Sequence, residues 1–314
     1  MAFKFFPNKS DPNMGGKKQS ASTAPRRKKF RFEYMAFLVG IVVVFRWWTS
    51  TQLTPTRKIG HIQPAILYTL QSDPNVHVLG SYPHDKAAFT QGLLVESPGI
   101  LIESTGLYHR SSVRRFNVTT GVASHHTAPF MSTEFGEGIT WNAATDSYVV
   151  LTWKAMTGYV LHKDDFRVLS TFALPPTTRD QGWGITTITD TQELVVSDGS
   201  HVLHVWDPVT LTETRRVSVL SAAGQPVANL NELEYARGYI FANIWYSNLV
   251  AQIDPITGAV VNMHDLSSLS AQKNADGDVL NGIAYDWKSD LFYVTGKLWD
   301  TMYLVRIDDK PPST

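Results

Sequence analysis

Gln91-Gly92-Leu93 is the first of five short blocks that recur along the chain. A polar or aromatic residue, a glycine and a leucine or isoleucine return as Glu137-Gly138-Ile139, Trp183-Gly184-Ile185 and Asn281-Gly282-Ile283, with Asn231-Glu232-Leu233 as a variant that lacks the glycine. Successive blocks are 46, 46, 48 and 50 residues apart. A period of this length in a chain of short β-rich runs predicts five similar structural units.

Each block is followed by a second apolar run with the composition of a strand. These runs are LIEST (101–105), VVLTW (149–153), LVVSD (194–198), FANIW (241–245) and FYVTGK (292–297). Units of three or four strands at a constant phase predict an all-β fold, a five-bladed β-propeller over residues 76–309, because a β-sandwich needs no such period. The last unit has room for only three strands, so we expect Val76–Tyr82 to supply its outer strand and close the ring.

The charges of the chain are unevenly distributed, although its 28 basic and 28 acidic residues cancel. Residues 1–31 contain nine basic residues and one acid, whereas residues 76–309 contain 15 basic and 25 acidic residues. The neutral total therefore combines a basic tail with an acidic domain, and we expect no nucleic-acid partner. The lack of cysteine excludes disulfides, a thiolate nucleophile and Cys-ligated metal sites.

The first 75 residues differ in composition from the rest of the chain. Residues 1–31 are rich in Lys, Ser, Pro and Gly and lack apolar periodicity, which predicts a disordered basic tail. Residues 32–48 include an unbroken apolar stretch and would extend about 25 Å as a helix, at the short end of the membrane-spanning range. Residues 49–75 would form a stem or linker.

Three interpretations of residues 32–48 compete: an uncleaved signal anchor, a cleaved signal peptide and a buried core helix. We favour a signal-anchor transmembrane helix, because the basic region before it is long and no small-residue cleavage site follows it. The positive charges before the segment place the tail in the cytoplasm. We therefore expect a single-pass, type II membrane protein of the secretory pathway (ER, Golgi or cell surface). Its propeller would be lumenal or extracellular, and it would be secreted if the segment is cleaved.

The repeat also predicts where a functional site would form. The first and second strands of a blade run antiparallel, so the start of one and the end of the other meet beside the central channel. The residues that converge there are Gln91, Glu137, Trp183, Asn231 and Asn281 from first strands, and Thr105, Trp153, Asp198, Trp245 and Lys297 from second strands. Aromatic walls with a few converging polar groups are typical of a small-ligand pocket.

Each of these residues also has a purely structural interpretation. Glu137 could accept backbone hydrogen bonds, Lys297 could be its salt-bridge partner, and the Trp and Asn residues could pack blades and cap turns. Convergence on one rim favours a site. The histidines do not favour a metal site, because pairs such as His201 and His204 point to opposite faces of a strand. We expect acid–base chemistry by one carboxylate, with no metal and no cofactor.

Longer motifs around these positions carry a family resemblance. They include YPHDKAAFTQGL (82–93), FGEGIT (135–140), GWGIT (182–186), NLNELEY (229–235), ANIW (242–245) and TGKLW (295–299). Together they resemble the plant- and bacterial-type glutaminyl cyclases, or glutaminyl-peptide cyclotransferases, and not the zinc-dependent animal-type cyclase. The resemblance implies a five-bladed propeller that converts the N-terminal Gln of peptides and proteins to pyroglutamate and releases ammonia.

The active-site positions implied by the resemblance coincide with the predicted rim and add Phe89. Because the substrate's own α-amine attacks its side-chain carboxamide, we expect Glu137 to act as general acid and base. Asn231 and Lys297 would bind the γ-carbonyl oxygen, and Gln91 would orient the amine or amide. The aromatic residues of the substrate pocket would be Phe89, Trp153, Trp183 and Trp245.

Two other functions stay open at the level of the sequence. A non-catalytic propeller would use the same pocket to bind a peptide N-terminus or another small ligand. A propeller hydrolase or lyase would hold a divalent metal, for which only Glu137 and Asp198 are available as rim carboxylates. The tail and its apolar segment depart from the common family pattern, which leaves membrane attachment separate from the catalytic interpretation.

Overall fold

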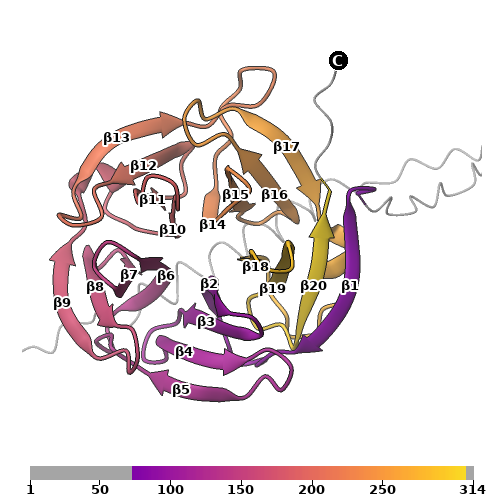
Figure 1. The fold of residues 1–314 in the computed structure, drawn as a ribbon, viewed down its shortest axis with the longest axis horizontal. Coiled ribbons are helices and arrows are strands. Elements are labelled where there is room, and N and C mark those ends of the chain that lie inside the picture. Colours follow the sequence, from indigo (N-terminus) through magenta and orange to yellow (C-terminus); the bar gives the residue numbers. More distant parts are fainter. Residues whose placement is uncertain (1–72, 309–314) are drawn as a thin grey trace, which may run out of the picture. The chain divides into compact units, whose positions relative to one another are not determined.

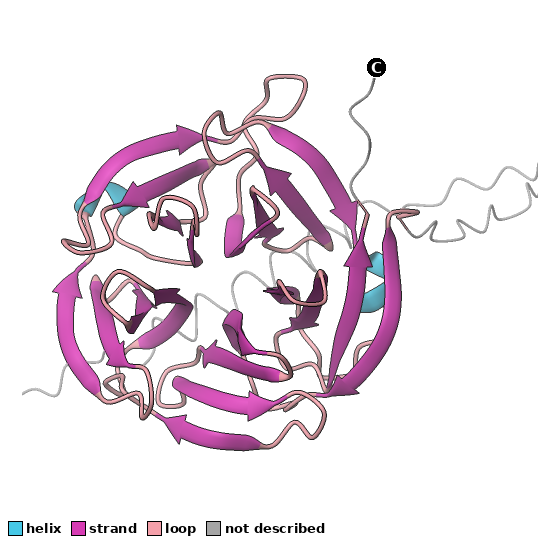
Figure 2. Cartoon of the chain, viewed as in Figure 1, coloured by secondary structure: helices cyan, strands magenta, loops and turns pink. Residues whose placement is uncertain are grey.

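The computed structural model describes residues 73–308, which form five four-stranded antiparallel sheets around a central channel (Figure 1). Each sheet is one blade, so the predicted all-β, five-bladed propeller is confirmed. Strands dominate, and the short helical segments lie at the outside of the ring (Figure 2). These segments are a 3-10 turn at Pro176–Thr178 and α2 at Ser267–Ser270.

Each blade is built from its innermost strand outward. Blade 1 contains β2 (Thr90–Ser97), β3 (Ile100–Thr105), β4 (Ser112–Asn117) and β5 (Ala123–Thr127). Blade 2 contains β6 (Phe135–Asn142), β7 (Ser147–Trp153), β8 (Thr157–His162) and β9 (Val168–Ala173). Blade 3 contains β10 (Ile185–Thr187), β11 (Leu194–Ser197), β12 (Val202–Trp206) and β13 (Glu213–Ser218). Blade 4 contains β14 (Leu230–Ala236), β15 (Tyr239–Ile244), β16 (Leu249–Ile253) and β17 (Val260–Asp265), and blade 5 contains β18 (Leu280–Asp286), β19 (Leu291–Gly296), β20 (Thr301–Ile307) and β1 (Val76–Pro83).

Burial explains the sequence of each strand. The second strand of a blade is covered on both faces, which is why β7 carries the continuous apolar run Val149–Leu151. Outermost strands face solvent and are more polar, as in the sequence ASHHT of β5. Five hydrophobic clusters fill the spaces between neighbouring blades. Between blades 4 and 5, for example, the rings of Phe241 and Phe292 pack with centroids 4.9 Å apart.

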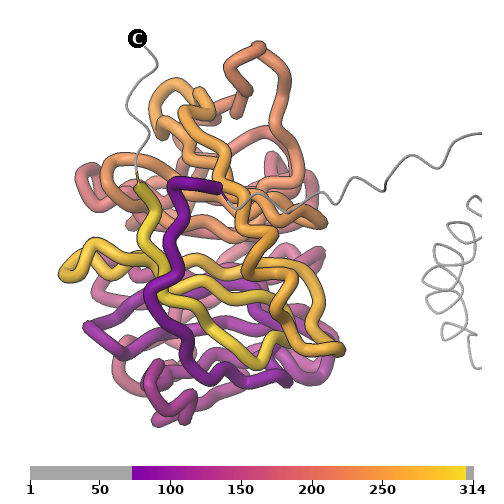
Figure 3. The backbone as a smooth tube through the Cα atoms, turned by 90° about the vertical axis from the view of Figure 1, so that its right-hand side faces the viewer, coloured from indigo at the N-terminus to yellow at the C-terminus, as the bar shows by residue number. Residues whose placement is uncertain are grey.

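The ring is closed by the two ends of the described chain. β1 pairs with β20 from Val76 opposite Ile307 to Pro83 opposite Thr301. Figure 3 shows the two strands side by side, β1 in indigo and β20 in yellow. The expectation that Val76–Tyr82 completes the last blade is therefore confirmed. Without β1, β20 would be an edge strand with a row of unpaired backbone groups.

The predicted tail at 1–31 and the predicted membrane-spanning segment at 32–48 lie outside the described residues, as does the stem at 49–75 except for its last three residues. Within residues 73–308, no helix has the length and apolar composition needed to cross a bilayer. Asp73 is buried and accepts a hydrogen bond from the backbone N–H of Asp265 at 3.3 Å. The chain is thus already attached to blade 4 just before β1 begins.

We predict that a chain starting at residue 85 melts about 10 °C or more below a chain starting at residue 73. Losing β1 should lower the free energy of unfolding by several kcal/mol, and each kcal/mol shifts Tm by roughly 2–4 °C in a domain of this size. Unfolding should remain a single transition in differential scanning calorimetry, because neighbouring blades share their hydrophobic clusters. Equal melting temperatures would show that the ring does not need β1.

Candidate active site

Four of the five inner strands share one irregularity near their start. In blade 2, Glu137 and Gly138 together lie opposite a single residue of β7, Leu151, which makes a β-bulge. Similar register shifts occur at Gln91 in β2, at 231–232 in β14 and at 281–282 in β18. A bulge takes a side chain out of the regular alternation of a strand. In these four blades the first residue of the repeated block can therefore face the channel instead of a blade interface.

The glycine of the block lets neighbouring inner strands approach closely. A Cβ atom on Gly184 would lie 2.1 Å from the carbonyl oxygen of Asn231 in the next blade. One on Gly138 would lie 2.7 Å from the carbonyl oxygen of Trp183. Gly138 N–H instead donates to that oxygen at 2.7 Å, and Ser197 Oγ donates to the Asn231 oxygen at 2.6 Å. The blocks thus join the blades to one another as well as forming the rim.

Three polar side chains of the predicted rim form one hydrogen-bonded chain. Asn281 Nδ2 donates to Gln91 Oε1 at 3.2 Å and to the backbone oxygen of Thr90 at 3.0 Å. Gln91 Nε2 donates in turn to Glu137 Oε1 at 3.0 Å. Asn281, Gln91 and Glu137 each expose 5% or less of their surface. The orientation of the Gln91 amide is fixed, because its oxygen accepts from Asn281 while its nitrogen donates to the carboxyl group.

Glu137 and Lys297 influence each other's ionisation without forming a direct ion pair within the described residues. Burial raises the pKa of the Glu137 carboxyl well above its ordinary value, and the Lys297 charge opposes part of this rise. Burial lowers the pKa of the Lys297 amine, an effect that Glu137 and Asp278 oppose. Burial thus shifts both groups toward their neutral forms, which makes proton exchange near neutral pH easier for each.

Aromatic side chains lie beside these polar groups. Lys297 Nζ lies 4.9 Å from the ring centroid of Phe89, and this ring packs edge-on against Phe135 with centroids 5.9 Å apart. Trp153 also packs against Phe135, at 5.8 Å, and donates its Nε1–H to Gln181 Oε1 at 2.9 Å. The rings of Phe89, Phe135 and Trp153 therefore form a continuous wall that extends from Lys297 into blade 2.

Trp183 and Trp245 form a second aromatic pair, with centroids 5.1 Å apart and ring planes at 79°. Trp183 Nε1 and Asn231 Oδ1 are buried and have no hydrogen-bond partner within residues 73–308. An unpaired buried donor or acceptor costs about 1–3 kcal/mol, and native proteins rarely tolerate one without a reason. This donor and this acceptor, on neighbouring blades, are suited to a ligand that pairs with both.

Comparison with known proteins identifies the family. A sequence model described as glutamine cyclotransferase matches residues 55–307. The chain belongs to the glutamine cyclotransferase family. It is 34% identical over 299 residues to a glutaminyl-peptide cyclotransferase of Arabidopsis thaliana, with 92% of this chain and 88% of the relative covered. It also resembles the crystal structure of Myxococcus xanthus glutaminyl cyclase, with a TM-score of 0.66, 32% identity, and coverage of 75% of this chain and 97% of that chain.

One residue that the sequence places on the rim, Asp198, does not join the cluster around Glu137. Asp198 faces His204 instead, with Oδ2 3.4 Å from the Nε2 atom, and its Oδ1 accepts the N–H of Ser200 at 2.9 Å. Among the described residues, no group of three or more His, Cys, Asp or Glu side chains is arranged to hold a metal ion. Asp198 therefore belongs to a buried hydrogen-bonded group of blade 3.

Two residues join the cluster without a role predicted from the sequence. Phe135 links the rings of Phe89 and Trp153, and its only sequence signal is its place two residues before Glu137 in FGEG. The repeat places Asn281 on the rim, but nothing in the sequence indicates that it holds Gln91. Both contacts depend on side-chain directions at the bulges.

We predict that Lys297→Met shifts the acid limb of the kcat/KM profile to higher pH. A general base at Glu137 would act only when ionised, and the Lys297 charge favours that form, so its removal would raise the pKa of Glu137 further. The profile should be measured between about pH 5 and 9, with Lys297→Arg as the control that retains the charge. An unmoved acid limb in Lys297→Met would mean that the two groups are not coupled.

Proposed function

We propose that the chain converts N-terminal Gln residues of peptides and proteins to pyroglutamate and releases ammonia. Its membership of the cyclotransferase family, the Arabidopsis relative and the Myxococcus structure support this activity. The observation that carries the proposal is the buried Glu137 carboxyl, which Gln91 holds in place beside the charge of Lys297.

The cyclisation requires one group that takes a proton and later returns it. The α-amine nitrogen of the substrate attacks its own side-chain amide carbon, a C–N bond closes the five-membered ring, and the bond to the amide nitrogen breaks. Glu137 takes a proton from the attacking amine and gives one to the departing nitrogen, which leaves as ammonia. Because Gln91 occupies Oε1, we assign this transfer to Oε2 of Glu137. Its raised pKa suits both directions of transfer.

Negative charge develops on the side-chain amide oxygen of the substrate during the attack. We assign its stabilisation to Lys297 and to the amide of Asn231, which is 3% exposed. Asn231 Oδ1, which lacks a partner within the described residues, is then free to accept an N–H of the substrate, and Trp183 Nε1 can donate to a substrate oxygen. Removing one such donor typically slows an enzyme about 10²–10³-fold.

The other predicted site residues would position these groups. Gln91 holds the Glu137 carboxyl and would in this way orient the group that meets the substrate amine, and Asn281 fixes the direction of the Gln91 amide. Phe89, Trp153, Trp183 and Trp245 would wall the pocket, exclude water and keep the Gln side chain folded back toward its own amine.

We expect Glu137→Gln to lower kcat for ammonia release from Gln-Phe amide by about 10²-fold or more, because the isosteric amide cannot exchange the proton. Glu193→Gln, at a surface carboxylate bonded to Arg215, is the matched control and should retain activity. Melting temperatures of both variants close to that of the wild type would exclude unfolding as the cause of lost activity. If the folded wild-type chain released no ammonia but bound the peptide, it would be a non-catalytic binder of peptide N-termini.

We further propose that residues 32–48 anchor the protein in a secretory-pathway membrane, with residues 1–31 in the cytoplasm and residues 49–75 as a stem. The apolar run and the nine basic residues before it support this topology. The similarity to the Arabidopsis relative covers 92% of the chain, so it is not confined to residues 73–308. The propeller would then be lumenal or extracellular, or secreted if the segment is cleaved.

The anchor can be tested by alkaline carbonate extraction of membranes from cells that express the full chain. We expect the full chain to sediment with the membranes and a variant that lacks residues 32–48 to be released into the supernatant. Protease added to sealed vesicles should remove the tail and spare the propeller. Release of the full chain by carbonate would contradict the proposal.

A further inference from the structure

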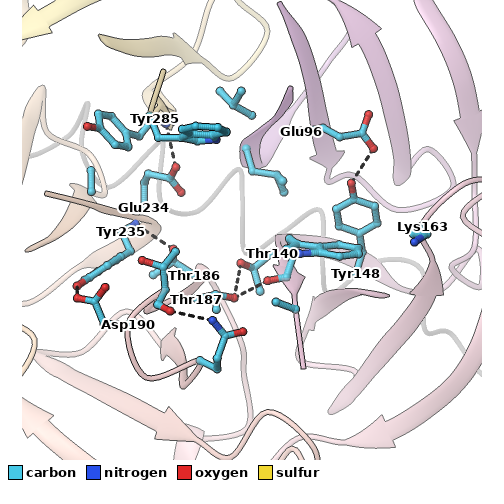
Figure 4. Close-up of a pocket in the computed structure, with 18 of the residues that line it drawn as sticks. Glu96, Thr140, Tyr148, Lys163, Thr186, Thr187, Asp190, Glu234, Tyr235 and Tyr285 are labelled. Carbon is cyan, nitrogen blue, oxygen red and sulfur yellow. Dashed lines mark hydrogen bonds between the residues drawn. The ribbon is translucent and has the colours of Figure 1, made fainter. Parts of the chain in front are cut away.

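A cavity of about 800 Å³ has a lining that includes none of the Glu137 cluster, and Figure 4 shows a close-up of it. Residues from the later parts of all five inner strands line it, three or more positions beyond the first residue of each repeated block. At ~3.3 Å per residue, this places the cavity about 10 Å along the strands from the proposed active site. None of its residues takes part in the proposed cyclisation, so its composition requires another explanation.

The walls of the cavity are aromatic. They include Trp141, Tyr148, Tyr235, Tyr285 and Trp287. Trp141 and Tyr148 pack with centroids 5.2 Å apart, whereas Trp287 is 64% exposed. The faces of aromatic rings attract cations, and indole does so most strongly. An exposed tryptophan that lines a cavity is placed to contact a ligand as it enters.

Five carboxylates and two basic residues line the same cavity. Most of these charges are already paired. Glu96 accepts hydrogen bonds from Arg115, and Lys163 donates to Asp146. The hydroxyl of Tyr235 donates to Asp190, and Arg237 donates to Asp290 outside the cavity lining. Within residues 73–308, the lining carboxyls that form no ion pair are Asp190, which accepts from Tyr235, and Glu234.

Glu234 is half-buried on β14 and accepts the backbone N–H of Tyr285 at 2.9 Å. It forms no ion pair within residues 73–308, and burial raises its pKa to about 8. Glu232, two residues earlier on β14, is buried. Burial raises its pKa, and the charge of Glu234 raises it further. Figure 4 shows Glu234 beside Tyr285, with Tyr148 and Glu96 across the cavity. The titratable and charged groups around Glu234 are Glu232 and Arg237 from its own chain segment, Tyr285 from β18, Asp190 from the loop after β10 and Glu96 from β2.

We propose that this cavity binds an organic cation, with an ammonium group against the Glu234 carboxylate and an apolar body between the aromatic walls. The ammonium supplies the positive partner that Glu234 lacks, and the rings supply cation–π and apolar contacts. A volume of about 800 Å³ is within the range of pockets for small organic ligands. The site is separate from the Glu137 cluster and does not depend on the cyclase activity.

The test is calorimetric titration of the full chain with phenethylammonium, with phenethyl alcohol as the neutral ligand of similar shape. We expect the amine to bind and the alcohol to bind at least about tenfold more weakly. Glu234→Gln should weaken amine binding about tenfold or more, while Glu137→Gln should leave it unchanged. Trp287→Ala, at an exposed residue, should weaken binding about threefold or more without affecting the fold, which keeps the test valid if Glu234→Gln does not fold.

A second readout follows from the titration of Glu234. Below a pKa of about 8 the carboxyl is mostly protonated, so binding of a cation near pH 7 must release a proton. Affinity should be about eightfold higher near pH 8.5 than near pH 7, and the heat near pH 7 should depend on the ionisation enthalpy of the buffer. Equal affinity for the alcohol, or amine binding lost only in Glu137→Gln, would overturn the proposal, as would no binding by the wild-type chain.

Discussion

The close approach of the five inner strands is the constraint on which both the ring and its site depend. A hydrogen bond crosses each of the five junctions between neighbouring blades at the repeated blocks. These bonds are Ser104 Oγ–H to Glu137 O, Gly138 N–H to Trp183 O, Ser197 Oγ–H to Asn231 O, Gly282 N–H to Asn243 Oδ1, and Asn281 Nδ2–H to Thr90 O. Three of these bonds end on the backbone oxygens of Glu137, Trp183 and Asn231, whose side chains form part of the rim. A change that loosened one junction would therefore displace a functional group.

Glu232 shows what happens where the block lacks its glycine. Its side chain extends from blade 4 and accepts the backbone N–H of Ile283 in blade 5 at 2.9 Å and that of Leu93 in blade 1 at 3.3 Å. A carboxyl group thus connects three blades near the centre of the ring. Burial raises its pKa well above the ordinary value, so it resists ionisation. The variant block supports the ring with a side chain where the blocks at Gly92, Gly138 and Gly184 do so through close backbone contact.

Much of this arrangement could be predicted from the sequence, because it depends on spacing. The period of the blocks gives five blades, the missing strand of the last unit assigns Val76–Tyr82, and antiparallel pairing puts Glu137 on the rim. The partners of the rim side chains could not be predicted. A bulge inserts one residue and changes which side chain faces the channel, so the Gln91–Glu137 bond follows from local register. The contact of Asp198 with His204 depends on side-chain directions in blade 3 that the repeat does not encode. The far cavity escaped prediction for a related reason, since its lining comes from the ends of five separate strands and from several turns.

The separation of Glu137 from Lys297 is favourable for proton transfer. A direct ion pair would hold the carboxyl ionised and the amine protonated, moving the two pKa values apart. Here burial dominates, raising the pKa of one group and lowering that of the other. The proposed mechanism has one carboxylate accept a proton and then donate one, and such a group is most efficient when its pKa lies near the operating pH. Because Gln91 donates to only one carboxyl oxygen, it can fix the position of Glu137 while the other oxygen remains able to exchange the proton.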